Sequence, residues 1–163
     1  MFKENEYVVY KRDVCKVKGI RHSSRNDQDY YTLAPIIDDS LTISVPTENL
    51  NNCIRPLISL EEVERIINEI PNVEAITNQH RMIENEYKRL LNTGDHLDLI
   101  KIIKTTYLRN NEREEAGKKT TEKDSIYHKM AEKVLYYEFS LVLNMSYDDT
   151  EEYVVNKVRE LTK

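Results

Sequence analysis

Hydrophobic residues in the first third of the chain occur in short runs that are separated by polar clusters. In the run at 41–46, Leu41, Ile43 and Val45 alternate with polar residues. A period of two, in segments rich in Val, Ile and Tyr, is typical of half-buried strands. The apolar runs are 6–11, 14–20, 29–37 and 41–46, and the polar clusters between and after them include 23–28, 38–40 and 47–52. The pattern therefore predicts four or five short strands in a small, strongly bent sheet or barrel.

From Ser59 onward the apolar residues recur with a helical period. Ser59 and Glu62 fit a capping box, and Pro71 ends the helix that follows. A second helix is expected from Val73 to Asn92, where Gly94 provides a stop signal. Three further helices are predicted to begin at Asp95, Thr121 and Ser146. The fold class is therefore α+β, with a small β module followed by an all-α part of about five helices.

The predicted third and fourth helices each show an apolar stripe, and a polar segment separates them. The stripe of the third helix is Leu97, Ile100, Ile103 and Tyr107, and that of the fourth is Ile126, Met130, Val134, Tyr137 and Leu141. The segment 110–119 has no apolar anchor and mixes charges of both signs, so it is predicted to be a mobile linker. A basic tip at Lys118 and Lys119 within reach of a phosphate is the alternative interpretation.

Composition and charge narrow the class of protein. The 163 residues carry a net charge of −5, which argues against binding nucleic acid by bulk electrostatics alone. Residues 100–133 nevertheless hold 9 basic against 6 acidic side chains, so an anion-binding face is expected there. No apolar run reaches membrane length and no signal peptide is evident, which predicts a cytoplasmic protein without a membrane partner. Cys15 and Cys53 are expected to be reduced.

Catalytic and metal-binding motifs are missing from the sequence. Three glycines are too few for a glycine-rich phosphate loop, and no nucleophile elbow or zinc-protease motif occurs. The four histidines are far apart in sequence and none neighbours a cysteine. The sequence therefore predicts a protein that is not an enzyme, with no catalytic residue, metal, cofactor or small-molecule substrate.

Read as a whole, the chain resembles the CarD/CdnL family of bacterial transcription regulators. The N-terminal module of that family is shared with the RNA polymerase-interaction domain of the transcription-repair coupling factor. The segments that carry the resemblance are MFKENEYVVY at 1–10, DYYTL at 29–33, LTISVP at 41–46, ISLEEVERII at 58–67, YKRLLNTGD at 87–95, DLIKIIKTTYLRN at 98–110 and MAEKVLYYEFSLVLNMS at 130–146. Their order and spacing extend over most of the chain.

The resemblance implies a function, with a separate role for each of the two domains. Residues 1–58 would form a Tudor-like domain that docks on the β subunit of RNA polymerase. Residues 59–163 would form a helical domain that contacts promoter DNA upstream of the melted region, largely independently of sequence. Such a protein modulates the stability of the open promoter complex, acts as a monomer and is associated with the nucleoid through RNA polymerase.

Candidate contact residues follow from this resemblance and from the charge pattern. For the polymerase they are Arg21, Tyr31, Ile43 and Ser44, on the hairpin 20–34 and the strand LTISVP. For DNA they are His80, Arg81, Lys88, Arg89, Lys101, Lys104 and Arg109. His80 stands where many family members have a tryptophan proposed to wedge into the minor groove. It is either a smaller wedge or a polar residue on a solvated helix face.

An alternative function is a pure protein-interaction module, in which the helical domain binds protein instead of DNA. The acidic ends of the helical half and the lack of tryptophan favour it. The surface formed by residues 80–133 discriminates between the two functions. A contiguous basic face there favours DNA, and a mixed or apolar face favours protein.

Overall fold

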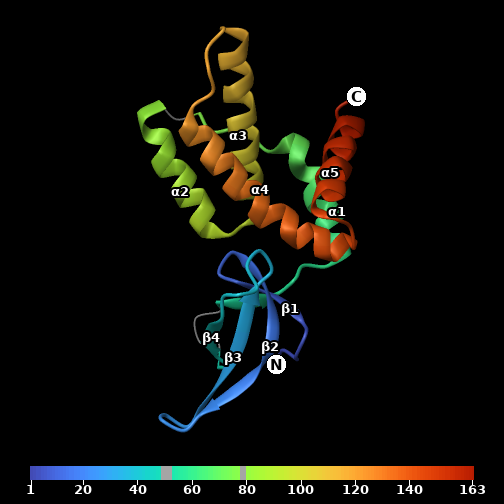
Figure 1. The fold of residues 1–163 in the computed structure, drawn as a ribbon. Coiled ribbons are helices and arrows are strands. Elements are labelled where there is room, and N and C mark those ends of the chain that lie inside the picture. The colour runs from blue at the N-terminus through green and yellow to red at the C-terminus, as the bar shows by residue number, and fades with distance from the viewer. Residues whose placement is uncertain (49–52, 78–79) are drawn as a thin grey trace. The chain divides into compact units, whose positions relative to one another are not determined.

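The computed structural model describes residues 1–48, 53–77 and 80–163, and the side chain of His80 lies outside the described part. The chain divides into two compact units, Met1–Leu57 and Ile58–Lys163. Within the described residues, the first holds a five-stranded antiparallel sheet and the second holds five α-helices. Figure 1 shows the strands and helices of the two units. The α+β class predicted from the sequence is confirmed.

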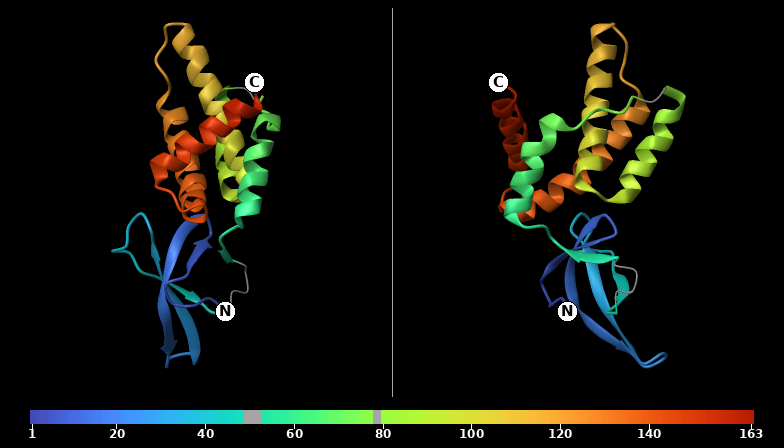
Figure 2. Two further views of the ribbon diagram at one scale, coloured as in Figure 1. Left: turned by 90° about the vertical axis from the view of Figure 1, so that its right-hand side faces the viewer. Right: turned by 180° about the vertical axis from the view of Figure 1, so that it is seen from behind.

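The β unit is one sheet whose strands follow the order β4-β3-β2-β1-β5. Its strands are β1 (Tyr7–Tyr10), β2 (Asp13–Ser23), β3 (Gln28–Pro35), β4 (Ile43–Pro46) and β5 (Ile54–Pro56). The register between β2 and β3 shifts between Val17 and Gly19, where a bulge interrupts the pairing. Beyond this bulge the two strands continue as a long hairpin, which Figure 2 shows. A bulge increases local twist, so the sheet bends at this point.

Seven buried residues form the core of the β unit, and they come from all five strands. They are Val8, Cys15, Val17, Tyr31, Leu33, Val45 and Ile54. Burial raises the pKa of the Cys15 thiol to about 11, with a smaller contribution from Asp13. Cys15 is therefore a protonated core residue rather than a nucleophile.

The helical unit contains five α-helices and two short 3-10 helices. They are α1 (Leu60–Glu69), η1 (Ile70–Asn72), η2 (His80–Met82), α2 (Ile83–Thr93), α3 (His96–Glu115), α4 (Glu122–Leu143) and α5 (Tyr147–Leu161). Side chains at the predicted starts cap four of them: Ser59 accepts from the N–H of Glu62, Asp95 from Leu97, Thr121 from Asp124 and Ser146 from Asp149. The local cap signals thus set these starts.

Helix α4 lies at the centre of the helical unit, where it contacts α1, α2, α3 and α5. Its deepest side chains include Ala131, Leu135 and Phe139, which are at most 1% exposed. The predicted stripe is therefore displaced by about one residue, and Ile126 is 47% exposed. The buried face of α3 differs in the same way, because Tyr107 is 58% exposed whereas Leu99 and Ile102 are buried. A helix with neighbours on several sides is buried over more than the single stripe that the sequence pattern shows.

The predicted second helix is wrong at its start, because α2 begins at Ile83 rather than Val73. The N–H of Ile76 donates to the hydroxyl of Thr105 at 2.8 Å, and the carbonyl of Val73 accepts from Lys104 at 2.7 Å. Both residues also pack against the helical core. These tertiary contacts hold 73–77 in an irregular conformation.

The predicted linker at 110–119 is also wrong in its first half, since α3 continues to Glu115. Gly117 has φ +72°, and the N–H groups of Gly117 and Lys118 donate to the carbonyls of Glu114 and Arg113 at 3.0 and 2.8 Å. This pair of hydrogen bonds is a Schellman motif. Gly117 is therefore the stop signal of a longer helix.

No helix among the described residues is long and apolar enough to cross a membrane.

Candidate functional site

Strand β4 forms one edge of the sheet, and its hydrogen-bonding register identifies the groups on that edge. The N–H of Thr47 donates to the carbonyl of Asp29 at 3.0 Å, and Val45 pairs with Tyr31 in the same register. Backbone groups in an antiparallel strand alternate between the partner and the opposite side. The N–H and C=O of Ser44 therefore point away from β3, whereas Pro46 has no N–H to offer. Ser44 is exposed and can accept an added strand.

The hairpin of β2 and β3 adds side chains on the same face of the sheet as Ser44. Arg21 pairs with Tyr30, and its guanidinium carbon lies 5.8 Å from the centre of the Tyr30 ring. The amide of Asn26 donates to the Tyr30 hydroxyl at 2.7 Å. Arg21 is exposed and Tyr30 is partly exposed, so both are accessible to a partner.

Tyr31 was a predicted polymerase contact, and the structure corrects this. It is 2% exposed, and its hydroxyl accepts a hydrogen bond from the N–H of Phe2 at 3.1 Å. The two rings pack edge to face, with their centres 5.7 Å apart. Successive side chains of a strand point to opposite faces, so Tyr30 is the outward tyrosine of the pair. Tyr31 is two residues from Leu33, which is buried, so the two side chains lie on the same face of the strand. This alternation in the sequence identifies Tyr30 as the outward tyrosine.

Ile43, the fourth polymerase candidate, lies between the core and the surface of the β unit. It is partly buried and packs against the small core of the β unit. Arg21 and Ser44 thus remain surface candidates together with Tyr30, and Ile43 contributes mainly to the support of the edge.

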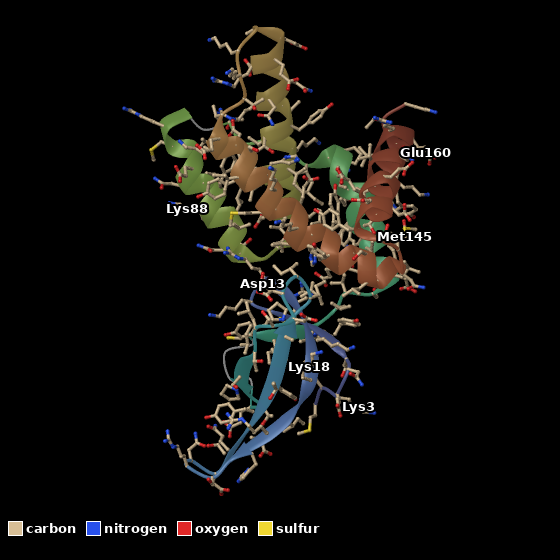
Figure 3. The ribbon with its side chains drawn as sticks, viewed as in Figure 1. Lys3, Asp13, Lys18, Lys88, Met145 and Glu160 are labelled. Carbon is tan, nitrogen blue, oxygen red and sulfur yellow. The ribbon has the colours of Figure 1, made fainter. Side chains whose placement is uncertain are left out.

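Four of the predicted DNA contacts, Arg81, Lys88, Arg89 and Lys101, are exposed or partly exposed, and carboxylates accompany the two on α2. Lys88, labelled on α2 in Figure 3, lies 3.7 Å from Glu84. The Nε of Arg89 donates to Glu86 at 3.2 Å, and this hydrogen bond lowers the pKa of the Glu86 carboxyl. Lys101 is partly exposed and Arg81 is exposed. The surface of α2 is therefore mixed in charge rather than a contiguous basic face.

Lys104 was a predicted DNA contact, but the structure places its ammonium inside the helical unit. It donates to the carbonyls of Ile70, Pro71 and Val73 at 2.9, 3.3 and 2.7 Å. These carbonyls lie where α1 and η1 end, and a cation there satisfies groups that lack helical partners. Lys104 therefore stabilises the fold through these three carbonyls.

Arg109 is partly buried and pairs with a carboxylate of the interior. Its Nε donates to the carboxylate of Asp124 at 3.0 Å, and the two side chains are 16% and 0% exposed. The hydroxyl of Tyr87 donates to the same carboxylate at 2.8 Å. Burial, together with this hydrogen bond, raises the pKa of Tyr87. The three residues form a buried polar cluster that joins α2, α3 and α4.

The backbone of His80 begins η2, directly before α2. Its side chain, on which the wedge prediction depends, lies outside the described residues.

A second buried carboxylate, Glu138, fixes the start of the helical unit. Its Oε2 accepts a hydrogen bond from the N–H of Ile58 at 3.0 Å, and its Oε1 lies 2.8 Å from Nε2 of His96. Glu138 is 2% exposed. The carboxylate thereby ties α4 to both the first residue of the unit and the start of α3.

The described residues contain no group of three or more His, Cys, Asp and Glu side chains that could hold a metal ion.

Comparison with family models assigns the N-terminal module. Residues 2–58 match the CarD-like/TRCF RID domain. The comparison with curated proteins returned no match. The match confirms the resemblance that the sequence showed for this module, and it indicates a transcription-related domain that interacts with RNA polymerase. The likeness of the helical half to the same family stays a prediction.

Proposed function

We propose that this chain, whose residues 2–58 form a CarD-like/TRCF RID domain, is a transcription regulator that binds the β subunit of RNA polymerase and promoter DNA together. The β unit holds the polymerase through the free edge of β4. The helical unit contacts the DNA upstream of the bubble with little sequence preference. The result is a change in the stability of the open promoter complex.

The main support for this proposal is that β4, within the matched domain, is an edge strand of the sheet. Ser44 presents an N–H and a C=O on the side of β4 opposite β3. An extended segment of a partner adds to such an edge through backbone hydrogen bonds, and neighbouring side chains provide specificity. Arg21 and Tyr30 are on the same face as Ser44 and supply a cation and an aromatic ring.

Two weak contacts act together in this mechanism. Once the β unit holds the polymerase, the helical unit is confined near the promoter, which raises its effective concentration there. A protein that fits the opened promoter better than the closed one shifts the equilibrium by the difference between the two affinities. Weak binding to isolated DNA, expected from the net charge of −5, is compatible with this mechanism.

The polymerase contact is tested with Ser44→Pro in the full chain, with Ser44→Ala as its matched control. Proline removes the outward N–H of Ser44 and leaves the pairing of Val45 with Tyr31 intact, because edge strands tolerate proline at such positions. Capture of a β-subunit fragment should be lost in Ser44→Pro and kept in Ser44→Ala. Equal capture by both variants contradicts docking through this edge. Ile43→Glu should also abolish capture, but Ile43 packs against the core, so Ser44→Pro is the sharper test.

The DNA contact is tested at His80. We expect the lifetime of the open complex to fall in His80→Ala and to rise in His80→Trp, because indole buries more apolar area in a minor groove than imidazole does. The measurement is the decay of open complexes after addition of a competitor. Lifetimes equal to that of the unmodified chain in both variants reject the wedge.

The mixed charge on α2 favours one alternative, in which the helical unit binds a protein. Glu84 and Glu86 accompany Lys88 and Arg89 there. Salt dependence separates the two functions, because phosphate contacts release counterions and make affinity fall steeply with salt. If the full chain fails to bind a promoter fragment even at low salt, while polymerase capture is retained, the protein-interaction alternative gains.

A further inference from the structure

A pocket of about 280 Å³ opens between the end of α3 and the start of α4. Its lining residues are Arg109, Arg113, Thr121 and Lys123. Three of the four side chains are cationic, and two of them, Arg113 and Lys123, lie outside the DNA contacts predicted from the sequence. The pocket belongs to the region of 100–133 where basic residues outnumber acidic ones.

The walls of this pocket are held in place by contacts of their own. The Nε of Arg113 donates to the carbonyl of Lys119 at 2.8 Å, within the turn that the Schellman motif closes. Arg109 is fixed by the carboxylate of Asp124. Both guanidinium groups are therefore anchored by the chain before any ligand arrives, which reduces the entropy lost on binding.

The charge balance of the pocket is positive. Asp124 is 0% exposed and neutralises Arg109 from the interior. The ammonium of Lys123 is 3.6 Å from Glu84, a carboxylate that also lies 3.7 Å from Lys88. An ion pair at this distance, in which two lysines share one carboxylate, contributes little free energy at an exposed position. Arg113 and Lys123 therefore leave the pocket with a surplus of positive charge.

Helix α4 adds to this charge. Thr121 caps the helix by accepting a hydrogen bond from the N–H of Asp124 at 3.2 Å. The first turn of a 22-residue helix carries partial positive charge. This turn contains Lys123 together with two acids, Glu122, which is exposed, and Asp124, which is buried against Arg109. A guanidinium, an ammonium and a helix start around one pocket form a combination that suits a tetrahedral oxyanion.

We propose that the pocket of Arg109, Arg113, Thr121 and Lys123 binds a phosphate group. Two sources share this chemistry: a phosphodiester of the DNA backbone, and a free phosphate or phosphate monoester. Binding of a DNA phosphodiester rests on the proposed function. In that case the main phosphate contact of the helical unit is the hairpin of α3 and α4 rather than α2. The binding of a free phosphate does not depend on that function.

The first experiment is a titration of the full chain with inorganic phosphate, followed by the amide resonances of 113–124. Shifts should be largest at this segment, and Lys123→Gln should weaken phosphate binding by about tenfold, the value of one charge-assisted hydrogen bond. Lys133→Gln is the matched control, because Lys133 is an exposed lysine on the same helix and does not line the pocket. Arg113→Gln provides a second variant from the opposite wall.

The second experiment measures the binding of a short DNA duplex to the same variants at several salt concentrations. If a backbone phosphate is the ligand, Lys123→Gln should reduce the slope of log affinity against log salt by about one, and Lys133→Gln should leave it unchanged. Phosphate binding with no effect of Lys123→Gln on the duplex identifies the free anion as the ligand.

Two results overturn the inference. One is the absence of phosphate-induced shifts in 113–124 of the unmodified chain. The other is an equal loss of phosphate binding in Lys123→Gln and Lys133→Gln, which shows only diffuse attraction. Capture of the β-subunit fragment depends on Ser44 and should be unaffected by these variants. Failure of the pocket and failure of the proposed polymerase contact are therefore separate outcomes.

Discussion

The two units of the chain differ in the polar side chains that they bury. The β unit has a core of seven apolar residues, and its backbone is paired within the sheet except at the two edge strands. The helical unit has fifteen buried apolar residues around α4, and it also contains all six buried polar or charged residues of the described chain. Asp124 and Glu138 are the two carboxylates among them.

This difference indicates where each unit is sensitive. A sheet leaves its edges open, so the β unit has unsatisfied backbone groups at its surface, where a partner can use them. A central helix with neighbours on several sides buries polar side chains, and each buried charge needs a partner inside. The helical unit should therefore be most sensitive to the loss of a polar partner, and the β unit to the loss of apolar volume.

Replacement of Asp124 with Ala should produce the largest effect. It leaves the buried guanidinium of Arg109 and the hydroxyl of Tyr87 without their shared acceptor, so the free energy of unfolding should fall by about 3–5 kcal/mol. Urea unfolding followed by circular dichroism measures it. Glu122→Ala, an exposed acid in the same helical turn, is the control and should cost at most about 1 kcal/mol. Equal losses in the two variants contradict a structural role for the cluster.

Replacement of Leu33 with Ala tests the apolar core of the β unit. Leu33 is 0% exposed, and its truncation should destabilise this unit by about 3 kcal/mol. Amide hydrogen exchange should accelerate in β1 to β3 and stay unchanged in α4. Ile20→Ala, at a 48% exposed position of the same sheet, is the control and should change the exchange rates little. Faster exchange throughout α4 would show that the two units unfold as one.

Alkaline pH should affect the β unit through Cys15. Its pKa is raised from the ordinary 9.0 to about 11 in the folded chain, mainly by burial. Above pH 9 the unfolded chain forms the thiolate and the folded chain does not, so stability is lost as the pH rises from 9 towards 11. Below pH 9 this contribution is fully present. Unfolding measured from pH 8 to 11 in the unmodified chain and in Cys15→Ala checks it. The difference in stability between the two should shrink over this interval.

The smallest effect is expected at two glycines, Gly19 of the β unit and Gly117 of the helical unit. Gly117 has φ +72° and Gly19 has no positive φ, and a Cβ would meet nothing within 4 Å at either position. Gly117→Ala should therefore cost about 1 kcal/mol from the backbone alone. Gly19→Ala should be neutral or stabilise the chain by a few tenths of a kcal/mol. Thermal unfolding of both variants measures the contrast, and a larger cost at Gly19 would reverse it.

Local signals in the sequence predicted much of the fold. Ser59, Asp95, Thr121 and Ser146 each cap the helix expected to begin there, because a side-chain oxygen and an N–H three residues away or closer need no distant partner. The strand 41–46 was predicted from its alternation, and β4 occupies its last four residues, Ile43–Pro46, as an edge strand. Within the candidate site, Arg21 and Ser44 are on the surface as expected.

The candidate residues whose surroundings the sequence did not show are those whose side chains have partners far along the chain. Lys104 donates to carbonyls more than thirty residues away, and Arg109 pairs with Asp124 across two helices. A basic residue on a helix looks the same in the sequence whether it faces solvent or a buried acceptor. The pocket at Arg113 and Lys123 has the same origin, since only the pairing of α3 with α4 brings these two residues together.

The sequence by itself determined that strands come first and helices follow along the chain, and it determined four of the helix starts. It also determined that residues 2–58 resemble a polymerase-interaction domain. These features depend on periodicity, caps and turns, which act over a few residues. Only the tertiary structure decided that Tyr31 is buried, that Ser44 faces the open side of β4 and that Lys104 lies inside the helical unit. Burial and pairing are properties of contacts between distant segments, and the physical roles of these side chains are fixed only when those segments meet.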